Sequence, residues 1–169
     1  MAEVRELASG LKFPEGPVAM SDGSVVLVEI QGARISRVSP DGSTDVVAET
    51  GGGPNGSAIG PDGKLYVANN GGAFEWHEIE GLTIPGATPD TWEGGRIERV
   101  DLDSGEVDVL YRECDGNQLR GPNDLVYVCR HDAPRGELVV VTLWEEGEDA
   151  RVPRRFTDAL RPTDERPKR

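Results

Sequence analysis

Cysteines and long apolar runs are scarce in this sequence. It has two cysteines among 169 residues, and Cys114 and Cys129 do not form a CxxC motif. We therefore expect free thiols in a reducing compartment rather than a disulfide framework. There is no apolar run of 18 residues, and residues 1–7 show no apolar signal-peptide core. These absences predict a cytoplasmic protein without a membrane-spanning helix.

Basic residues are also scarce over most of the chain. Residues 1–128 carry 9 Lys or Arg and 22 Asp or Glu, so they hold the whole net charge of −13. Nucleic acids and anionic membranes are themselves negatively charged, so this balance disfavours both as partners. The acidic surplus is compatible with a cation site, but it is also typical of an ordinary solvated surface.

A strand–turn–strand unit recurs along the chain. Pro14 and Pro54 stand 40 residues apart, and each is followed eight residues later by an Asp-Gly dipeptide, at 22–23 and 62–63. Apolar runs at residues 25–28 and 65–68 come next, and a third opening starts at Pro122. With 22 Gly and 12 Pro, this pattern predicts an all-β protein made of β-propeller blades, about two and a half to three of them.

The three openings are expected to occupy equivalent places in successive blades. They read Pro-Glu-Gly, Pro-Asn-Gly and Pro-Asn-Asp at residues 14–16, 54–56 and 122–124. We interpret them as turns or stiff loops that lead into strands, and residues 3–11 as a first short strand. Because equivalent places in a propeller ring its central axis, Glu15, Asn55 and Asn123 should converge at one end of it.

An insertion interrupts the second unit. Candidate outer strands at residues 34–38 and 96–100 start 62 residues apart, which exceeds the repeat and places an insert between Ala68 and Gly95. Inserts in a repeat usually form loops over one face, often the binding face. His77 in this insert is therefore a candidate substrate-binding residue, although a lone histidine near a tryptophan is more often structural or simply exposed.

The repeat stops after Tyr127. Residues 129–169 hold 9 of the 18 basic residues, and most of this segment has the composition of disorder. We therefore predict a partial propeller over residues 1–127 and a divergent, disordered tail over residues 128–169, in which residues 138–143 could still form one strand. We expect the tail to be an out-of-frame reading of a longer gene, with a divergent natural C-terminus as the alternative.

The chain resembles the senescence marker protein/gluconolactonase/luciferin-regenerating enzyme family. The resemblance rests on four motifs, at residues 13–17, 53–56, 67–72 and 119–126, and spans residues 7–127. It implies an incomplete six-bladed β-propeller whose family members bind a divalent cation on the central axis and hydrolyse lactones or related esters.

The resemblance also implies roles for particular residues. Glu15 and Asn123 match the family's cation ligands, and hard oxygen ligands suit calcium first, with magnesium, manganese or zinc as alternatives. Asn55, Asn69, Asn70 and Asp124 fall in the shared motifs and are expected, with His77, to contact the substrate. The family's base aspartate and a further asparagine ligand have no matching position, so the catalytic base is unassigned.

Two classes of function follow. The first is a metal-dependent hydrolase of a small lactone, of which this chain alone is expected to show little activity. The second is a non-catalytic propeller-like module for binding or assembly, with self-association through open blade edges.

Overall fold

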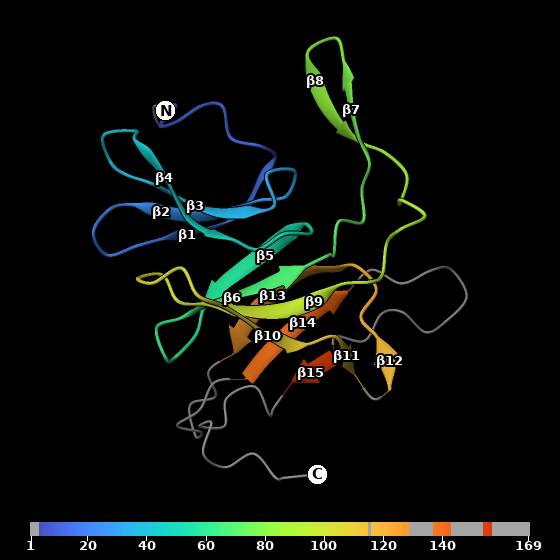
Figure 1. The fold of residues 1–169 in the computed structure, drawn as a ribbon. Coiled ribbons are helices and arrows are strands. Elements are labelled where there is room, and N and C mark those ends of the chain that lie inside the picture. The colour runs from blue at the N-terminus through green and yellow to red at the C-terminus, as the bar shows by residue number, and fades with distance from the viewer. Residues whose placement is uncertain (1–3, 115, 129–136, 143–153, 157–169) are drawn as a thin grey trace.

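The computed structural model describes residues 4–114, 116–128, 137–142 and 154–156 (Figure 1). All regular elements in these ranges are β-strands, which confirms the predicted all-β class. No helix in these ranges is long and apolar enough to cross a membrane. Cys129 and most of the predicted tail lie outside the described residues.

Two four-stranded antiparallel sheets form the first two blades. The first has the order β1-β2-β3-β4, and the second has the order β10-β9-β6-β5. The first contains β1 (Pro14–Ala19), β2 (Val25–Glu29), β3 (Arg34–Val38) and β4 (Thr44–Glu49). The second contains β5 (Pro54–Ile59), β6 (Leu65–Asn69), β9 (Arg96–Val100) and β10 (Val107–Tyr111).

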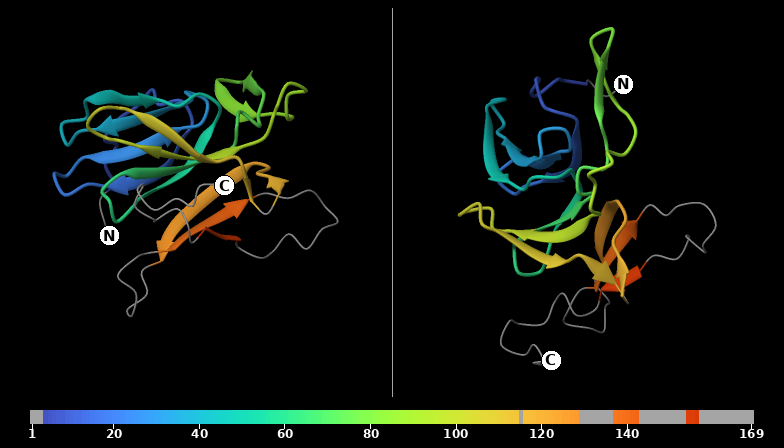
Figure 2. Two further views of the ribbon diagram at one scale, coloured as in Figure 1. Left: turned by 60° about the horizontal axis from the view of Figure 1, so that its bottom comes forward. Right: turned by 45° about the vertical axis from the view of Figure 1, so that its right-hand side comes forward.

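A third sheet follows the two blades. It contains β13 (Pro122–Val128), β14 (Glu137–Thr142) and β15 (Arg154–Phe156), and β14 confirms the strand predicted near residues 138–143. Two small hairpins complete the described strands: β7 (Trp76–Ile79) with β8 (Leu82–Pro85), and β11 (Glu113–Cys114) with β12 (Asn117–Gln118). The sheets lie beside one another as an open series of blades rather than a closed ring (Figures 1 and 2).

The prolines that suggested turns begin the inner strands instead. β1, β5 and β13 start at Pro14, Pro54 and Pro122. The interpretation of these motifs as turns or loops is therefore wrong, because the first position of a strand tolerates a residue that cannot donate to the sheet ladder. The Asp-Gly turns between the first two strands of each blade are present, with Gly23 and Gly63 at φ +83° and +76°.

The predicted strand over residues 3–11 is also wrong. Residues 4–11 contain no strand, and Gly10 has a φ of +77°, which interrupts extended backbone. The predicted outer strands at residues 34–38 and 96–100 are confirmed as β3 and β9.

Strand β6 lies at the centre of the described fold. All five of its residues are at most 1% exposed. Because side chains alternate along a strand, Leu65 and Val67 pack into the core shared with the first blade, while Tyr66 and Ala68 pack against Leu125 of β13. Burial on both faces explains why residues 65–68 of β6 are continuously apolar rather than alternating.

We predict that Leu65→Ala lowers the free energy of unfolding by about 2–5 kcal/mol, because it leaves a cavity between two blades. Val109→Ala, at a side chain that is 45% exposed on β10, should change it by no more than about 0.5 kcal/mol. Urea unfolding followed by tryptophan fluorescence measures both values, and similar costs for the two variants would contradict the shared core.

Candidate functional site

A β-bulge or similar irregularity interrupts the pairing near the start of each inner strand, at the second residue in β5 and β13 and after the second residue in β1. The register shifts between Glu15 and Val18 in β1, between Pro54 and Gly56 in β5, and between Pro122 and Asp124 in β13. A bulge leaves a residue outside the ladder and redirects its side chain, and bulges are common beside active sites. In β5 and β13 the residues left unpaired are Asn55 and Asn123. We call the Pro14, Pro54 and Pro122 ends of the three strands the rim.

The rim joins the inner strands of three blades. Asn55 Nδ2 donates a hydrogen bond to Asn123 Oδ1 over 2.9 Å, so the predicted convergence of these two asparagines is confirmed. On the other side of β5, Ser57 Oγ donates to the carbonyl oxygen of Gly16 over 2.7 Å. β5 therefore lies between β1, which carries Glu15, and β13, which carries Asn123.

Two glycines allow this close approach. A Cβ on Gly16 would lie 2.7 Å from the backbone nitrogen of Ser57, and a Cβ on Gly56 would lie 2.6 Å from Cα of Asp124. Both distances are too short for a side chain, so only glycine lets the neighbouring inner strands meet. The third motif has Asp124 at this position. Its exposed side chain accepts a hydrogen bond from the Leu125 amide over 2.7 Å.

The side chains of the rim are of the chemical type that could form one side of a site for a hard cation. Glu15 is exposed, and no hydrogen bond or ion pair joins its carboxylate to another described residue. The half-buried Asn123 Oδ1 accepts one hydrogen bond and keeps a second lone pair. No group of three or more His, Cys, Asp or Glu residues that could hold a metal occurs among the described residues. A carboxylate and amide oxygens are nonetheless ligands that calcium accepts.

The structure gives Asn69 a structural position. Its side chain is fully buried, and Oδ1 accepts hydrogen bonds from the amides of Gly53 and Gly71, both over 2.9 Å. Nδ2 donates to the carbonyl oxygen of Gly51 and to Glu98. No hydrogen-bonding group of Asn69 is left for a substrate, so the predicted substrate contact has no support from this geometry.

The side chain of Asn70 is also buried, but one of its polar atoms has no hydrogen bond to a described residue. It is 2% exposed, and its Oδ1 accepts from the amides of Gly72 and Ala73. Its backbone carbonyl accepts from Trp92 Nε1 over 2.8 Å. Nδ2 has no hydrogen-bond partner among the described residues. A donor therefore remains for a substrate or an ordered water, and its predicted contact with substrate stays a prediction.

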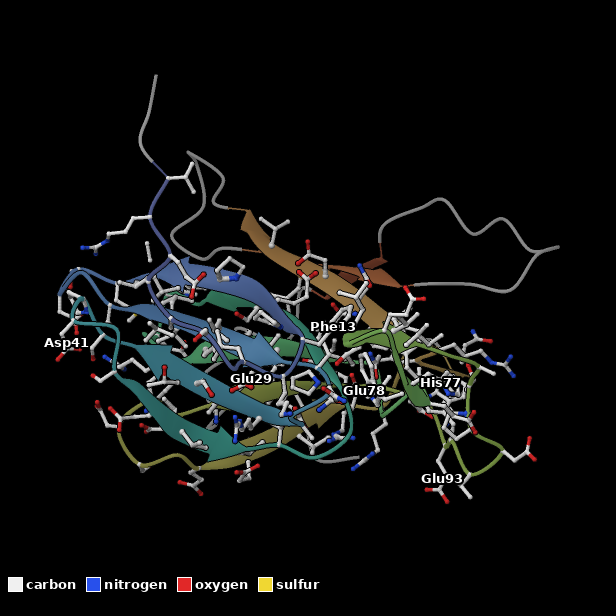
Figure 3. The ribbon with its side chains drawn as sticks, turned by 90° about the horizontal axis from the view of Figure 1, so that it is seen from above. Phe13, Glu29, Asp41, His77, Glu78 and Glu93 are labelled. Carbon is white, nitrogen blue, oxygen red and sulfur yellow. The ribbon has the colours of Figure 1, made fainter. Side chains whose placement is uncertain are left out.

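The insert forms the β7–β8 hairpin rather than a plain loop. This hairpin projects from the second blade (Figures 1 and 2). His77 is exposed on β7 and pairs across the hairpin with Ile84. Its ring lies against Gly86, where a Cβ would come within 2.3 Å of Nε2. Figure 3 shows His77 and Glu78 on this hairpin.

A buried carboxylate in the first blade was not predicted from the sequence. Glu29, at the end of β2, is fully buried, and its carboxylate accepts hydrogen bonds from Arg34 over 2.8 Å and from Ser36 over 2.5 Å. It also accepts from the backbone amide of Lys12. Glu29 therefore ties the segment that precedes Glu15 to the second strand of the blade.

The second blade contains a corresponding cluster with its carboxylate on another strand. Asn69 stands where Glu29 stands, and Arg96 pairs with it as Arg34 pairs with Glu29. Here the carboxylate belongs to Glu98, which is 1% exposed. Arg96 contacts Glu98 and donates to the carbonyl oxygen of Thr50 over 2.9 Å. The cluster therefore holds the connection between the two blades.

The two carboxylates have pKa values shifted in opposite directions. Burial alone would raise the pKa of Glu29, but hydrogen bonds from Arg34, Ser36 and Lys12 outweigh it and lower the pKa below its ordinary value. Burial raises the pKa of Glu98, and the hydrogen bond from Asn69 and the charge of Arg96 compensate only in part. The only sequence signal for these clusters is the equivalent position of Arg34 and Arg96 in the repeat.

Comparison with known proteins gives one family and a set of structures. The sequence model of the SMP-30/gluconolactonase/LRE-like region matches residues 13–160. A gluconolactonase from Xanthomonas campestris is 22% identical, with a TM-score of 0.58 over 80% of this chain and 37% of that one. A structural-genomics target assigned to the gluconolactonases is 23% identical, with a TM-score of 0.56 over 80% and 38% of the two chains. No curated protein matches the sequence.

These comparisons define what is shared. The chain spans less than two fifths of the length of the two gluconolactonases, and at this identity the likeness concerns the fold alone. The matched region runs across the boundary predicted at residue 127, and that boundary stays a prediction.

We predict that Gly16→Ala destabilises the protein more than Gly63→Ala. Both glycines have positive φ, but Gly63 has no atom within 4 Å of an added Cβ. Gly63→Ala should therefore cost about 1–2 kcal/mol of backbone strain, and Gly16→Ala about 1–3 kcal/mol more from the contact with β5. Urea unfolding measures the difference. Equal costs would show that β1 and β5 are not closely packed.

Glu29→Gln and Glu98→Gln should show opposite pH dependence. The lowered pKa of Glu29 stabilises the fold above its unfolded value near 4.5, so the cost of Glu29→Gln should shrink as pH falls below that value. Because the pKa of Glu98 is raised in the folded state, the fold is more stable with Glu98 protonated than with Glu98 charged. The loss of unfolding free energy caused by Glu98→Gln should therefore shrink as pH rises through the folded pKa of Glu98. Urea unfolding between about pH 3.5 and 8 tests both, and parallel slopes would contradict the assignment.

Proposed function

Because this chain belongs to the SMP-30/gluconolactonase/LRE-like family, we propose that its rim serves a metal-dependent hydrolase that opens a sugar lactone or a related ester. The observation that supports this most is the meeting of Asn55 on β5 and Asn123 on β13 across two blades, since β5 also contacts β1, the strand that carries Glu15. In this proposal Glu15 joins the two asparagines at the same end of the fold, so that three blades supply oxygen-bearing side chains to one site.

In this proposal Glu15 and Asn123 hold a divalent cation, calcium being the first choice. When bound, such a cation polarises the ester carbonyl as a Lewis acid. Glu15 supplies the negative charge, and its exposed position leaves room for a ligand. The hydrogen bond from Asn55 fixes the amide of Asn123 with its oxygen toward Asn55, so the remaining lone pair of that oxygen has a defined direction.

The same amides are suited to orient a sugar lactone. Asn55 Oδ1 and Asn123 Nδ2 have no hydrogen bond to another described residue, so one acceptor and one donor remain for substrate hydroxyl groups. We add Asp124, which is exposed beside Gly56, and the unpaired Nδ2 of Asn70 as further polar contacts. His77, on the β7–β8 hairpin, is also proposed as a substrate contact.

A non-catalytic module for binding or assembly is the second candidate. It is favoured by the open edges of the described sheets, since an unpaired edge strand can pair with another chain. On either view we propose a cytoplasmic protein that turns over little lactone as an isolated chain. Its open sheet edges would allow self-association.

Calcium titration followed by a turnover assay tests the proposal on the full chain. Calorimetry should show weak calcium binding that Glu15→Gln weakens by about tenfold or more. Glu106→Gln is the control, since it removes an exposed glutamate from the turn between β9 and β10. Hydrolysis of glucono-δ-lactone is then followed with a pH indicator, with and without chelator.

The outcomes separate the two candidates. Slow hydrolysis that both chelator and Glu15→Gln abolish supports the hydrolase. Glu15-dependent calcium binding without hydrolysis supports the binding module. Equal calcium binding by the wild type and Glu15→Gln overturns the cation site.

A further inference from the structure

Phe13 has an unusual backbone conformation two residues before Glu15. Its φ is +58°, in the left-handed region that a bulky residue rarely adopts. Such a conformation persists only where surrounding contacts hold it, and it is often found at functional sites. Pro14 follows directly, and its ring fixes the next φ near −65°. The backbone conformation of Phe13 therefore largely fixes the direction in which the chain reaches Glu15.

The backbone around Phe13 is held by β2 and its end. The Ile30 amide donates to the carbonyl oxygen of Phe13 over 3.0 Å. The amide of the preceding residue, Lys12, donates to the buried carboxylate of Glu29. The Gly32 amide also donates to the carbonyl oxygen of Lys12 over 3.3 Å, so both peptide groups that flank Phe13 are hydrogen-bonded. None of these bonds involves the side chain of Phe13.

The side chain of Phe13 is held by the insert. Its ring lies against Trp76 of β7, with ring centroids 4.9 Å apart and planes tilted by 53°. Trp76 in turn contacts Phe74 with centroids 6.1 Å apart. The base of the hairpin is closed by two hydrogen bonds between Glu75 and the segment after β8, from Gly86 over 2.7 Å and to Ala87 over 2.9 Å. Figure 3 shows Phe13 beside this hairpin.

We propose that Trp76 is a positioning residue, which holds Phe13 in its left-handed conformation and thereby directs Glu15 into the rim. This inference rests on the proposed function only in assigning Glu15 to a cation site. The contacts among Trp76, Phe13 and Ile30 do not depend on that assignment. The insert then acts on the site through the segment before β1, although it is inserted in the second blade between β6 and β9.

The alternative is that the aromatic contact merely attaches the hairpin to the body. In that case removal of the Trp76 ring would release the hairpin and leave the Phe13 backbone unchanged. The Ile30 amide distinguishes the two, because it is protected by the carbonyl of Phe13 and belongs to neither the hairpin nor the rim.

The experiment compares Trp76→Ala, Trp76→Phe and Leu82→Ala in the full chain. Leu82→Ala is the matched control, because Leu82 is 66% exposed on the same hairpin. Hydrogen exchange by NMR should show the Ile30 amide about two- to tenfold faster in Trp76→Ala, the range expected from one aromatic pair. Trp76→Phe should restore protection, and Leu82→Ala should not change it. Urea unfolding in parallel separates this local change from a loss of global stability.

Calcium affinity provides the second measurement, by calorimetry without substrate. Trp76→Ala should bind calcium about two- to tenfold more weakly than the wild type and Leu82→Ala. Unchanged Ile30 exchange in Trp76→Ala, or faster exchange with unchanged calcium affinity, would overturn the positioning role. If Glu15→Gln binds calcium like the wild type, the cation site itself fails, and Ile30 exchange alone decides whether Trp76 positions the segment.

Discussion

The close approach of the three inner strands is the constraint on which the rest of the structure depends. β1, β5 and β13 meet at backbone distance because Gly16 and Gly56 carry no side chain. The same approach brings Asn55 within 2.9 Å of Asn123. A single methyl group at either glycine would separate the strands and, with them, the polar side chains of the rim. The packing of the blades and the geometry of the candidate site therefore have one cause.

Each of the first two blades then uses one buried carboxylate and one arginine to hold the chain that leads into its inner strand. The first blade places the carboxylate on its second strand, at Glu29, which pairs with Arg34 of β3 and accepts a hydrogen bond from Ser36. The second blade places it on the third strand, at Glu98, and has an amide, Asn69, in the corresponding position. One carboxylate suffices for one arginine, since a second would be buried without a partner.

The β7–β8 hairpin shows how an insertion can be accommodated without loss of the blade. β6 and β9 pair continuously from Leu65 with Val100 to Asn69 with Arg96, although the hairpin lies between them in the sequence. Its Trp76 reaches back to Phe13, so a segment outside the repeat contacts the residues that precede Glu15.

The sequence by itself determined the all-β class, the repeat and its Asp-Gly turns, the apolar strands, and the equivalence of Asn55 and Asn123. These features are local, because a turn or a strand preference depends on neighbouring residues. The prolines were misread because proline suits both a turn and the first place of a strand, and only pairing with another strand decides between them. Sequence could not separate Asn55, which reaches another blade, from Asn69, which is buried beside Glu98. It also gave no sign of the positive φ of Phe13. Burial, strand pairing and close backbone approach join residues far apart in the chain, so only the tertiary structure decided them.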